Sequence, residues 1–233
     1  MSQKQQYLMG VRSSIPVILG FVPVGIAYAI MAQQAGFATF ETIFMSIAVF
    51  AGASQMMAVG MYAQGASLIT IILATFILNL RHLIMSTCVV NRMKNEKMGR
   101  KLLAAFGVTD ESFVIFTTEK EENSSALHFL GLVTVTYLSW IAGSAIGAVA
   151  SRLFPPIVSA SFGIALYAMF IAILVPNVKH NLRLGILVVF TAVVNLILTQ
   201  FIASSWALIV STLVCAAIGV FFVDLGDREG AAE

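Results

Sequence analysis

Inside one long uncharged stretch, the sequence FAGASQ interrupts a run of large apolar residues with Gly52, Ser54 and Gln55. Glycine and serine are weaker helix formers than alanine or leucine, so they weaken a helix that hydrophobicity alone would keep intact. A helix broken there frees backbone N–H and C=O groups, and the N–H groups that start its second half attract a carboxylate. The stretch therefore predicts a ligand-binding break. The alternative is a close helix–helix contact at Gly52, with Gln55 bonded to a neighbour.

A second polar group, Asn79, Arg81 and His82, lies in the next apolar segment. Asn79 and His82 are three residues apart and share one face of a helix, whereas Arg81 points about 100° away from His82. Arginine in an apolar segment is expected to pair with an acid, and the other two side chains are expected to face a polar cavity. Imidazole changes charge near neutral pH, which makes His82 a candidate proton carrier. The alternative for His82 is a packing residue.

The third group consists of Asp110 and Glu111, two adjacent acids inside the short apolar segment 102–118. Arg81 is the only base inside a predicted apolar helix, so one of these acids is its most economical counter-ion. The alternative is a helix N-terminus capped by Thr109 or Asp110, where acids in the first turn are favourable. Both interpretations can hold together.

The composition indicates what surrounds these groups. Hydrophobic residues make up 59% of the 233-residue chain and charged residues only 10%, with a mean hydropathy of +0.95. Soluble domains carry about 25% charged residues, so soluble, nucleic-acid-binding and disordered classes are excluded, and lipid must be the main solvent. Continuous apolar stretches, without alternation, exclude a β-barrel. The sequence therefore predicts an all-α integral membrane protein that lies in a lipid bilayer and binds no nucleic acid.

About seven transmembrane helices fit into the uncharged stretches, because one crossing needs roughly 20 apolar residues. The second helix is expected to be broken at FAGASQ, and segment 102–118 is expected to dip into the membrane without crossing it. The predicted spans are 14–35, 42–62, 66–89, 126–150, 157–177, 184–201 and 204–223.

The basic residues give these spans an orientation. If 102–118 does not cross, nine Lys and Arg residues share the side of the 91–125 loop and three share the other side. That loop and the C-terminus are then predicted to be cytoplasmic and the N-terminus outside, whereas a re-entrant 42–62 would place the N-terminus inside. The domain prediction is an N-terminal tail at 1–13, one transmembrane domain at 14–224 and a C-terminal tail at 225–233.

No cofactor, metal ion or enzymatic activity is expected from the sequence. It contains no nucleotide-binding G-x-x-x-x-G-K-[ST] loop, Cys88 and Cys215 lie far apart, and the histidines show no ligand spacing. Two other classes stay open. One is a channel or structural membrane subunit, and the other is an intramembrane serine protease that uses Ser54 and His82.

The order and spacing of these motifs resemble the AzlC family, the large subunits of two-component branched-chain amino acid exporters. The resemblance extends over roughly 8–224 and rests on four stretches: IPVILGFVPVGIAYA at 15–29, FAGASQ at 50–55, NLRH at 79–82 and TDESF at 109–113.

The resemblance implies secondary active export of leucine, isoleucine or valine, with methionine and azaleucine as further candidates. It implies a bacterial cytoplasmic (inner) membrane location, a proton gradient as the energy source, and a partner, a small AzlD-type membrane subunit. It assigns no residue roles, which come from the polar groups alone. Those groups predict substrate binding by Gly52, Ser54, Gln55 and Asn79, and ion pairing or coupling by Arg81, His82, Asp110 and Glu111.

Overall fold

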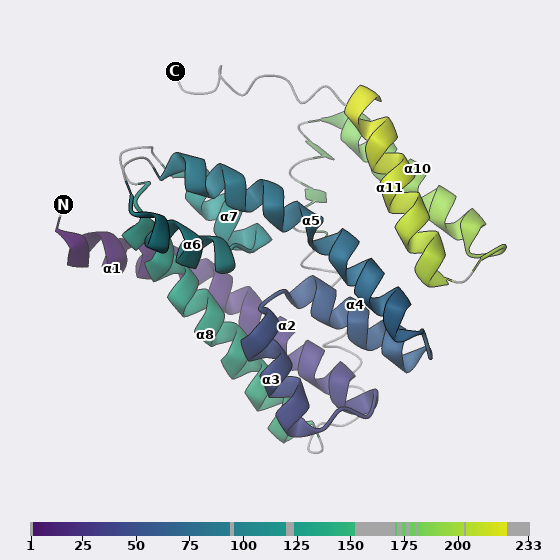
Figure 1. Ribbon diagram of the computed structural model, residues 1–233, viewed down its shortest axis with the longest axis horizontal. Helices are drawn as coiled ribbons and strands as arrows, with labels where there is room; N and C mark the ends of the chain where they lie inside the picture. The colour runs from purple at the N-terminus through teal and green to yellow at the C-terminus, as the bar shows by residue number, and fades with distance from the viewer. Residues whose placement is uncertain are drawn as a thin grey trace. The chain divides into compact units, whose positions relative to one another are not determined.

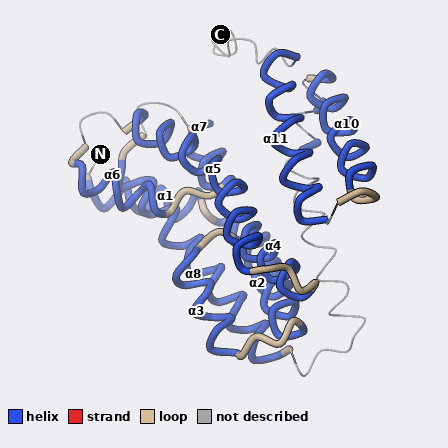
Figure 2. Tube along the Cα trace, turned by 45° about the vertical axis from the view of Figure 1, so that its right-hand side comes forward, coloured by secondary structure: helices blue, strands red, loops and turns tan. Residues whose placement is uncertain are grey.

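A computed structural model describes residues 2–93, 96–119, 124–151, 171, 174–175, 178–179, 181–202 and 204–222. These residues form helices and short connections, with no strand among them (Figures 1 and 2). The prediction of an all-α fold is confirmed. The chain divides into two compact units, Met1–Tyr167 and Ala168–Glu233.

Among the described residues of the first unit, three helices are long and apolar enough to cross a membrane: α2 (Ile15–Gln34), α5 (Leu68–Arg92) and α8 (Ala126–Ala150). They correspond to three of the predicted spans. Helix α2 starts with a proline in its first turn, where the missing N–H group costs nothing. A further helix, α1 (Gln3–Ser13), forms where the N-terminal tail was expected.

Helices α2 and α8 run parallel and in close contact, because glycines remove the side chains between them. A Cβ atom on Gly143 would lie 2.6 Å from the carbonyl oxygen of Val22, and one on Gly147 would lie 2.7 Å from that of Ile26. The contact continues along α1, since a Cβ atom on Gly10 would overlap the backbone of α8. Small residues at four-residue spacing allow this approach in membrane helices.

The predicted second span is broken as expected, and its two halves fold back on each other. Helix α3 (Thr39–Val49) starts at the far end of α2 and runs back along it, and Tyr28 Oη donates to the Thr42 carbonyl at 3.1 Å. Helix α4 (Gly52–Ala63) then returns to the same end, where the ring of Tyr62 lies 5.0 Å from that of Phe37. The α3–α4 pair is therefore a re-entrant hairpin whose tip lies halfway along α8 (Figure 1).

Segment 102–118 forms a second re-entrant hairpin, made of α6 (Met98–Phe106) and α7 (Asp110–Thr118). Helix α6 runs along α5 toward its middle, with Ser86 Oγ donating to the Ala105 carbonyl at 3.4 Å. Helix α7 runs back, and Arg92 Nη1 at the end of α5 donates to the Thr117 carbonyl at 2.7 Å. Dipping without crossing is what the sequence predicted for this segment.

The N-terminus lies at the same end as the 91–125 loop, which agrees with the re-entrant alternative for 42–62 and not with a placement outside. Ser13 Oγ donates to Glu119 Oε1 at 3.2 Å, and Gly10 packs against His128 at the start of α8. The N-terminus and the 91–125 loop therefore lie at one end, which we call the basic end. The other end, with the turns at Gly36 and Gly65, we call the far end. The physical reason is the re-entrant α3–α4 hairpin, which removes one crossing from the path.

In the second unit, α10 (Leu182–Leu198) and α11 (Ser204–Phe222) form an antiparallel pair. Asn195 Nδ2 donates to Ser211 Oγ at 3.1 Å across it, and Gly219 packs on Leu187. These helices correspond to the last two predicted spans. The predicted span 157–177 falls almost wholly outside the described residues, as does the C-terminal tail.

Candidate functional site

The break between α3 and α4 occupies two residues. Phe50 adopts a left-handed conformation (φ 42°, ψ 48°), and it is the one non-glycine residue with positive φ among those described. Ala51 follows at φ −140° and ψ 77°, and α4 starts after it without a side-chain cap. A left-handed residue costs about 1–2 kcal/mol outside glycine, so the surrounding contacts must hold it there.

Gln55 supplies several of those contacts and is fully buried. Its Oε1 accepts the backbone N–H of Ala51 at 3.3 Å and the indole N–H of Trp140 at 3.1 Å. Its Nε2 lies 3.3 Å from Ser46 Oγ, which lies 2.7 Å from Ser144 Oγ on α8. Because both ends of the amide are occupied, Gln55 holds the break in place and offers little to a ligand.

Helix α8 forms the wall behind the break. The Trp140 ring covers Gly52 so closely that a Cβ atom there would lie 2.7 Å from ring carbon Cη2. Tyr137 packs edge-on against Phe50, with ring centroids 4.9 Å apart, and its hydroxyl donates to the Ile47 carbonyl at 2.7 Å. That bond satisfies one of the carbonyls left free at the end of α3.

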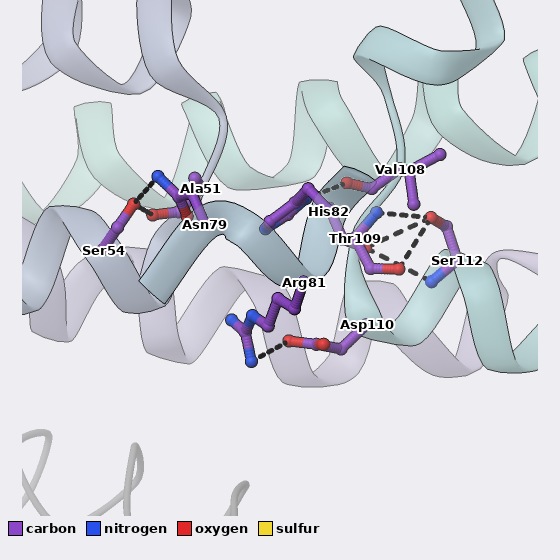
Figure 3. A network of polar contacts seen from close by, with 9 residues as sticks. All are labelled: Ala51, Ser54, Asn79, Arg81, His82, Val108, Thr109, Asp110 and Ser112. Atoms are coloured by element: carbon purple, nitrogen blue, oxygen red, sulfur yellow. Dashed lines mark hydrogen bonds and ion pairs between the residues drawn. The ribbon is translucent and has the colours of Figure 1, made fainter. Parts of the chain in front are cut away.

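Ser54 and Asn79 form the polar surface on the other side of the break (Figure 3). Ser54 Oγ donates to the Ala51 carbonyl at 2.9 Å and accepts from Asn79 Nδ2 at 3.2 Å. Asn79 Oδ1 is buried without a hydrogen-bond partner among the described residues. A buried acceptor without a donor is costly, by about 1–3 kcal/mol, which favours a ligand that brings one.

Arg81 pairs with the first of the two candidate acids. Its Nη1 lies 3.0 Å from Asp110 Oδ2, with 35% of the arginine side chain and 27% of the aspartate side chain exposed. Arg81 Nε is buried and, in the described part of the chain, unpartnered. Glu111 is half-buried beside the pair and makes no ion pair with any described residue. The pair joins the middle of α5 to the start of α7.

His82 points the other way, toward the tip of the α6–α7 hairpin. Its Nδ1 lies 2.9 Å from the Val108 carbonyl (Figure 3). A carbonyl can only accept, so Nδ1 carries the hydrogen, and Nε2 is the ring nitrogen that can bind a further proton. Thr109 caps α7, since its backbone N–H donates to Ser112 Oγ at 2.8 Å and its hydroxyl accepts from the Ser112 N–H at 3.2 Å. Capping and ion pairing therefore occur together in this segment.

Four further residues hold the break from the side of α8 and were not predicted from the sequence: Ser46, Tyr137, Trp140 and Ser144. Tyr137 and Trp140 lie on α8 close to the small residues Gly143 and Gly147. In the sequence, such aromatic residues indicate ordinary helix packing. A signal was available, because tyrosine and tryptophan in an apolar core need a partner for their O–H and N–H groups. The break frees such partners.

The protease alternative receives no geometric support. Ser54 bonds to Ala51 and Asn79, and His82 bonds to Val108, so the serine and histidine of a protease dyad face different partners. Among the described residues, no group of three or more His, Cys, Asp or Glu side chains could hold a metal ion.

Comparison with known proteins shows to which family the chain is similar. Residues 16–154 match the family model described as AzlC protein. An uncharacterized membrane protein of Archaeoglobus fulgidus is 31% identical over 181 residues, covering 77% of this chain and 79% of the relative. The inner membrane protein YgaZ of Escherichia coli is 30% identical over 185 residues, covering 75% and 74%.

A third relative carries a transport function in its name. The branched-chain amino acid transport protein AzlC of Bacillus subtilis is 31% identical over 155 residues, which cover 64% of this chain and 61% of that protein. No solved structure matches the chain. The matched region contains both hairpins and all three long apolar helices of the first unit.

Proposed function

The chain belongs to the AzlC family of multi-pass membrane proteins, and from that premise we propose that it exports branched-chain amino acids across the cytoplasmic (inner) membrane. The substrates are leucine, isoleucine and valine, with methionine and azaleucine as further candidates. The relative from Bacillus subtilis, named for branched-chain amino acid transport, supports the substrate class.

The observation that carries the proposal is the uncapped break at Ala51, halfway along the membrane helices. The N-terminus of α4 carries the positive end of its dipole and free N–H groups, which suit the carboxylate of an amino acid. Asn79 Oδ1, a buried acceptor to which no described residue donates, suits its ammonium group. The two features lie on either side of Ser54, which bonds to both Ala51 and Asn79.

Secondary transport needs an ion to move with or against the substrate. His82 is the candidate proton carrier, since its Nδ1 is held by Val108 and its Nε2 remains the site of protonation. Asp110 is engaged by Arg81, which leaves Glu111 as the second candidate. The proposal therefore couples outward amino acid movement to inward proton movement through these side chains.

We further propose that this chain is the large subunit of a pair, with a small AzlD-type membrane protein as its partner. This part of the proposal rests on the family resemblance. Helix α5 exposes apolar side chains on the face that points away from the other described helices of the first unit. Leu68, Ile69 and Phe76 are more than 60% exposed, and lipid or another protein must cover them.

Counterflow in membrane vesicles tests the function. Vesicles preloaded with unlabelled leucine should accumulate radiolabelled leucine and valine when the chain is present, and more strongly with the small subunit co-expressed. Radiolabelled methionine tests the breadth of the site, and radiolabelled lysine serves as the control that should not accumulate. Absence of leucine and valine counterflow with both subunits present would contradict the proposal.

A further inference from the structure

The two re-entrant hairpins enter the first unit from opposite ends. The tip of α3–α4, at Phe50 and Ala51, arrives from the far end, and the tip of α6–α7, at 107–109, arrives from the basic end. Each tip is bonded to α5, the first through Asn79 and the second through His82. These side chains lie one helical turn apart, so the two tips meet α5 at nearly the same depth.

Both tips also pack against one short stretch of α8. Gly52 of the first tip lies under the Trp140 ring, and Gly107 of the second lies against Val133, where a Cβ atom would fall 2.1 Å from Cγ1. The ring of Tyr137 lies between them along the helix. It contacts Phe50 with ring centroids 4.9 Å apart and Phe106 with centroids 6.4 Å apart.

The order of the elements repeats with inverted direction. Helix α2 leads from the basic end to the far end and is followed by the hairpin α3–α4. Helix α5 leads back to the basic end, where Arg92 Nε donates to Ser124 Oγ before α8, and is followed by the hairpin α6–α7. One long helix plus one hairpin thus occurs twice, once in each direction. Inverted repeats of broken helices that meet at the midplane are a recurrent basis for alternating access.

We infer that the α3–α4 and α6–α7 hairpins are opposed gates of one central site, which lies between their tips beside residues 79–82 of α5 and Tyr137 of α8. The α3–α4 hairpin closes the site toward the far end, and the α6–α7 hairpin closes it toward the basic end. The position of the amino acid between the tips rests on the proposed function. The gates themselves follow from the arrangement of the helices.

The contacts divide the unit into a fixed part and two movable parts. Helices α2 and α8 meet backbone to backbone at Gly25, Gly143 and Gly147, where any separation opens a void along the whole interface. Each hairpin tip, in contrast, is held by side chains. The first is bonded to Asn79 of α5 and Trp140 of α8, and the second is held by the bond of His82 and by the Arg81–Asp110 pair. Releasing a tip therefore breaks side-chain contacts and leaves the backbone packing of α2 against α8 intact.

The α3–α4 hairpin also has space at its open end. Its two limbs border a cavity of about 330 Å³ lined by Gly36, Phe37, Glu41, Met45 and Tyr62. A hairpin that hinges toward the far end can move into such a space without breaking the packing of α2 against α8. No Lys or Arg occurs between Arg12 and Arg81, so the hairpin carries no basic side chain, and its charged residue, Glu41, lies at the open end.

The first experiment maps the ends of the hairpins with single cysteines and needs no substrate. In a background with Cys88 and Cys215 replaced by serine, a cysteine is placed at Ala38, Gln64, Lys97 or Thr118, with Gln3→Cys as the marker of the basic end. A membrane-impermeant maleimide is applied to vesicles of either orientation. Positions 38 and 64 should react from the far side, and positions 97 and 118 from the side of position 3. A pair split between the two sides would overturn the inference.

The second experiment locks one gate at a time. Ser46→Cys with Ser144→Cys ties α3 to α8, because the two hydroxyl oxygens are 2.7 Å apart. Asn195→Cys with Ser211→Cys, at 3.1 Å in the second unit, is the matched control. The accessibility of each tip is measured by maleimide labelling of one added cysteine, Ala53→Cys for the first tip and Phe106→Cys for the second.

Oxidation of the lock should lower labelling at position 53, because this position is half-buried and becomes more accessible when the tip moves away from α8. Labelling at position 106 should not change, and a reductant should restore position 53. The control disulfide should change neither. Unchanged labelling at position 53 in the locked protein would overturn the gate assignment.

Leucine counterflow in the same variants separates this inference from the proposed function. If the lock stops counterflow reversibly and the control does not, gate and transport are linked. If no variant carries leucine but the labelling pattern is as expected, the proposed substrate is wrong and the gates stand. If leucine is carried while the lock leaves both labelling and counterflow unchanged, the gates are wrong and the function stands.

Discussion

Asn79 and His82 lie one turn apart on α5, and each bonds to a different helix break. Asn79 Nδ2 donates to Ser54 Oγ at 3.2 Å beside the first break, and His82 Nδ1 donates to the Val108 carbonyl at 2.9 Å at the second. A movement of α5 that changes one of these bonds therefore also affects the other bond, which lies one helical turn away. Proton binding and substrate binding, if they occur at these two side chains, share one rigid element.

Gln55→Ala should destabilise the protein more than it weakens substrate binding. The change leaves the indole N–H of buried Trp140 without an acceptor, at a cost of about 1–3 kcal/mol. The measurement is the melting temperature and yield of the detergent-solubilised protein. Gln64→Ala, at an exposed helix end, is the control and should change neither. Normal stability of Gln55→Ala with lost transport would mean that Gln55 contacts the substrate after all.

Asn79→Ala should weaken substrate binding without lowering the amount of folded protein. The variant removes the buried Oδ1 acceptor and the bond to Ser54, and one lost hydrogen bond corresponds to about a tenfold rise in the apparent KM of counterflow. Ser54→Ala should act in the same direction. If both variants keep the KM of the unaltered protein, the substrate binds elsewhere.

Arg81→Ala should lower the folded yield by leaving Asp110 without its partner. The penalty is about 1–3 kcal/mol, below that of a fully enclosed pair, because both side chains are partly exposed. Adding Asp110→Asn to Arg81→Ala should restore part of the yield. The comparison is Arg100→Ala, which removes an i,i+4 pair with Glu96 and should change stability by no more than about 0.5 kcal/mol. Additive losses in the double variant would count against the pair.

His82→Asn should keep substrate exchange and lose accumulation driven by a pH gradient. The asparagine Nδ2 can still donate to the Val108 carbonyl, so the second hairpin tip keeps its bond, but the side chain no longer titrates. His82→Leu is the matched variant that loses both the bond and the proton. The readouts are leucine counterflow at equal pH and leucine accumulation with an imposed pH gradient. Full gradient-driven accumulation by His82→Asn would assign the proton to Glu111 or to another group.

Much of the candidate site could be predicted from residue types. The break is foreseeable at Gly52 because weak helix formers interrupt an apolar run. The Arg81 pairing is foreseeable because one base in an apolar helix needs an acid, and the choice of Asp110 over Glu111 depends on which face of α7 meets α5.

The path of the chain through the membrane was harder to foresee. Residues 42–62 have the length of one crossing, and length cannot tell a crossing from a hairpin that turns at its middle. The decision is made by contacts between distant residues, such as the ring of Tyr62 on Phe37 and the indole of Trp140 on Gln55. The predicted side of the N-terminus followed directly from this. Counting 42–62 as a crossing reverses the side assigned to every residue that precedes it in the chain.

The Arg81–Asp110 pair also bears on how the chain is made. Asp110 follows Arg81 by 29 residues (110 minus 81), so at roughly 5–20 residues per second the ribosome supplies the acid about 1.5–6 s after the arginine. During that interval α5 holds an uncompensated charge that costs about 2.5–3.5 kcal/mol at the membrane centre. We therefore expect α5 to remain beside the translocon until the α6–α7 hairpin has been synthesised, and the two to enter the bilayer as one unit.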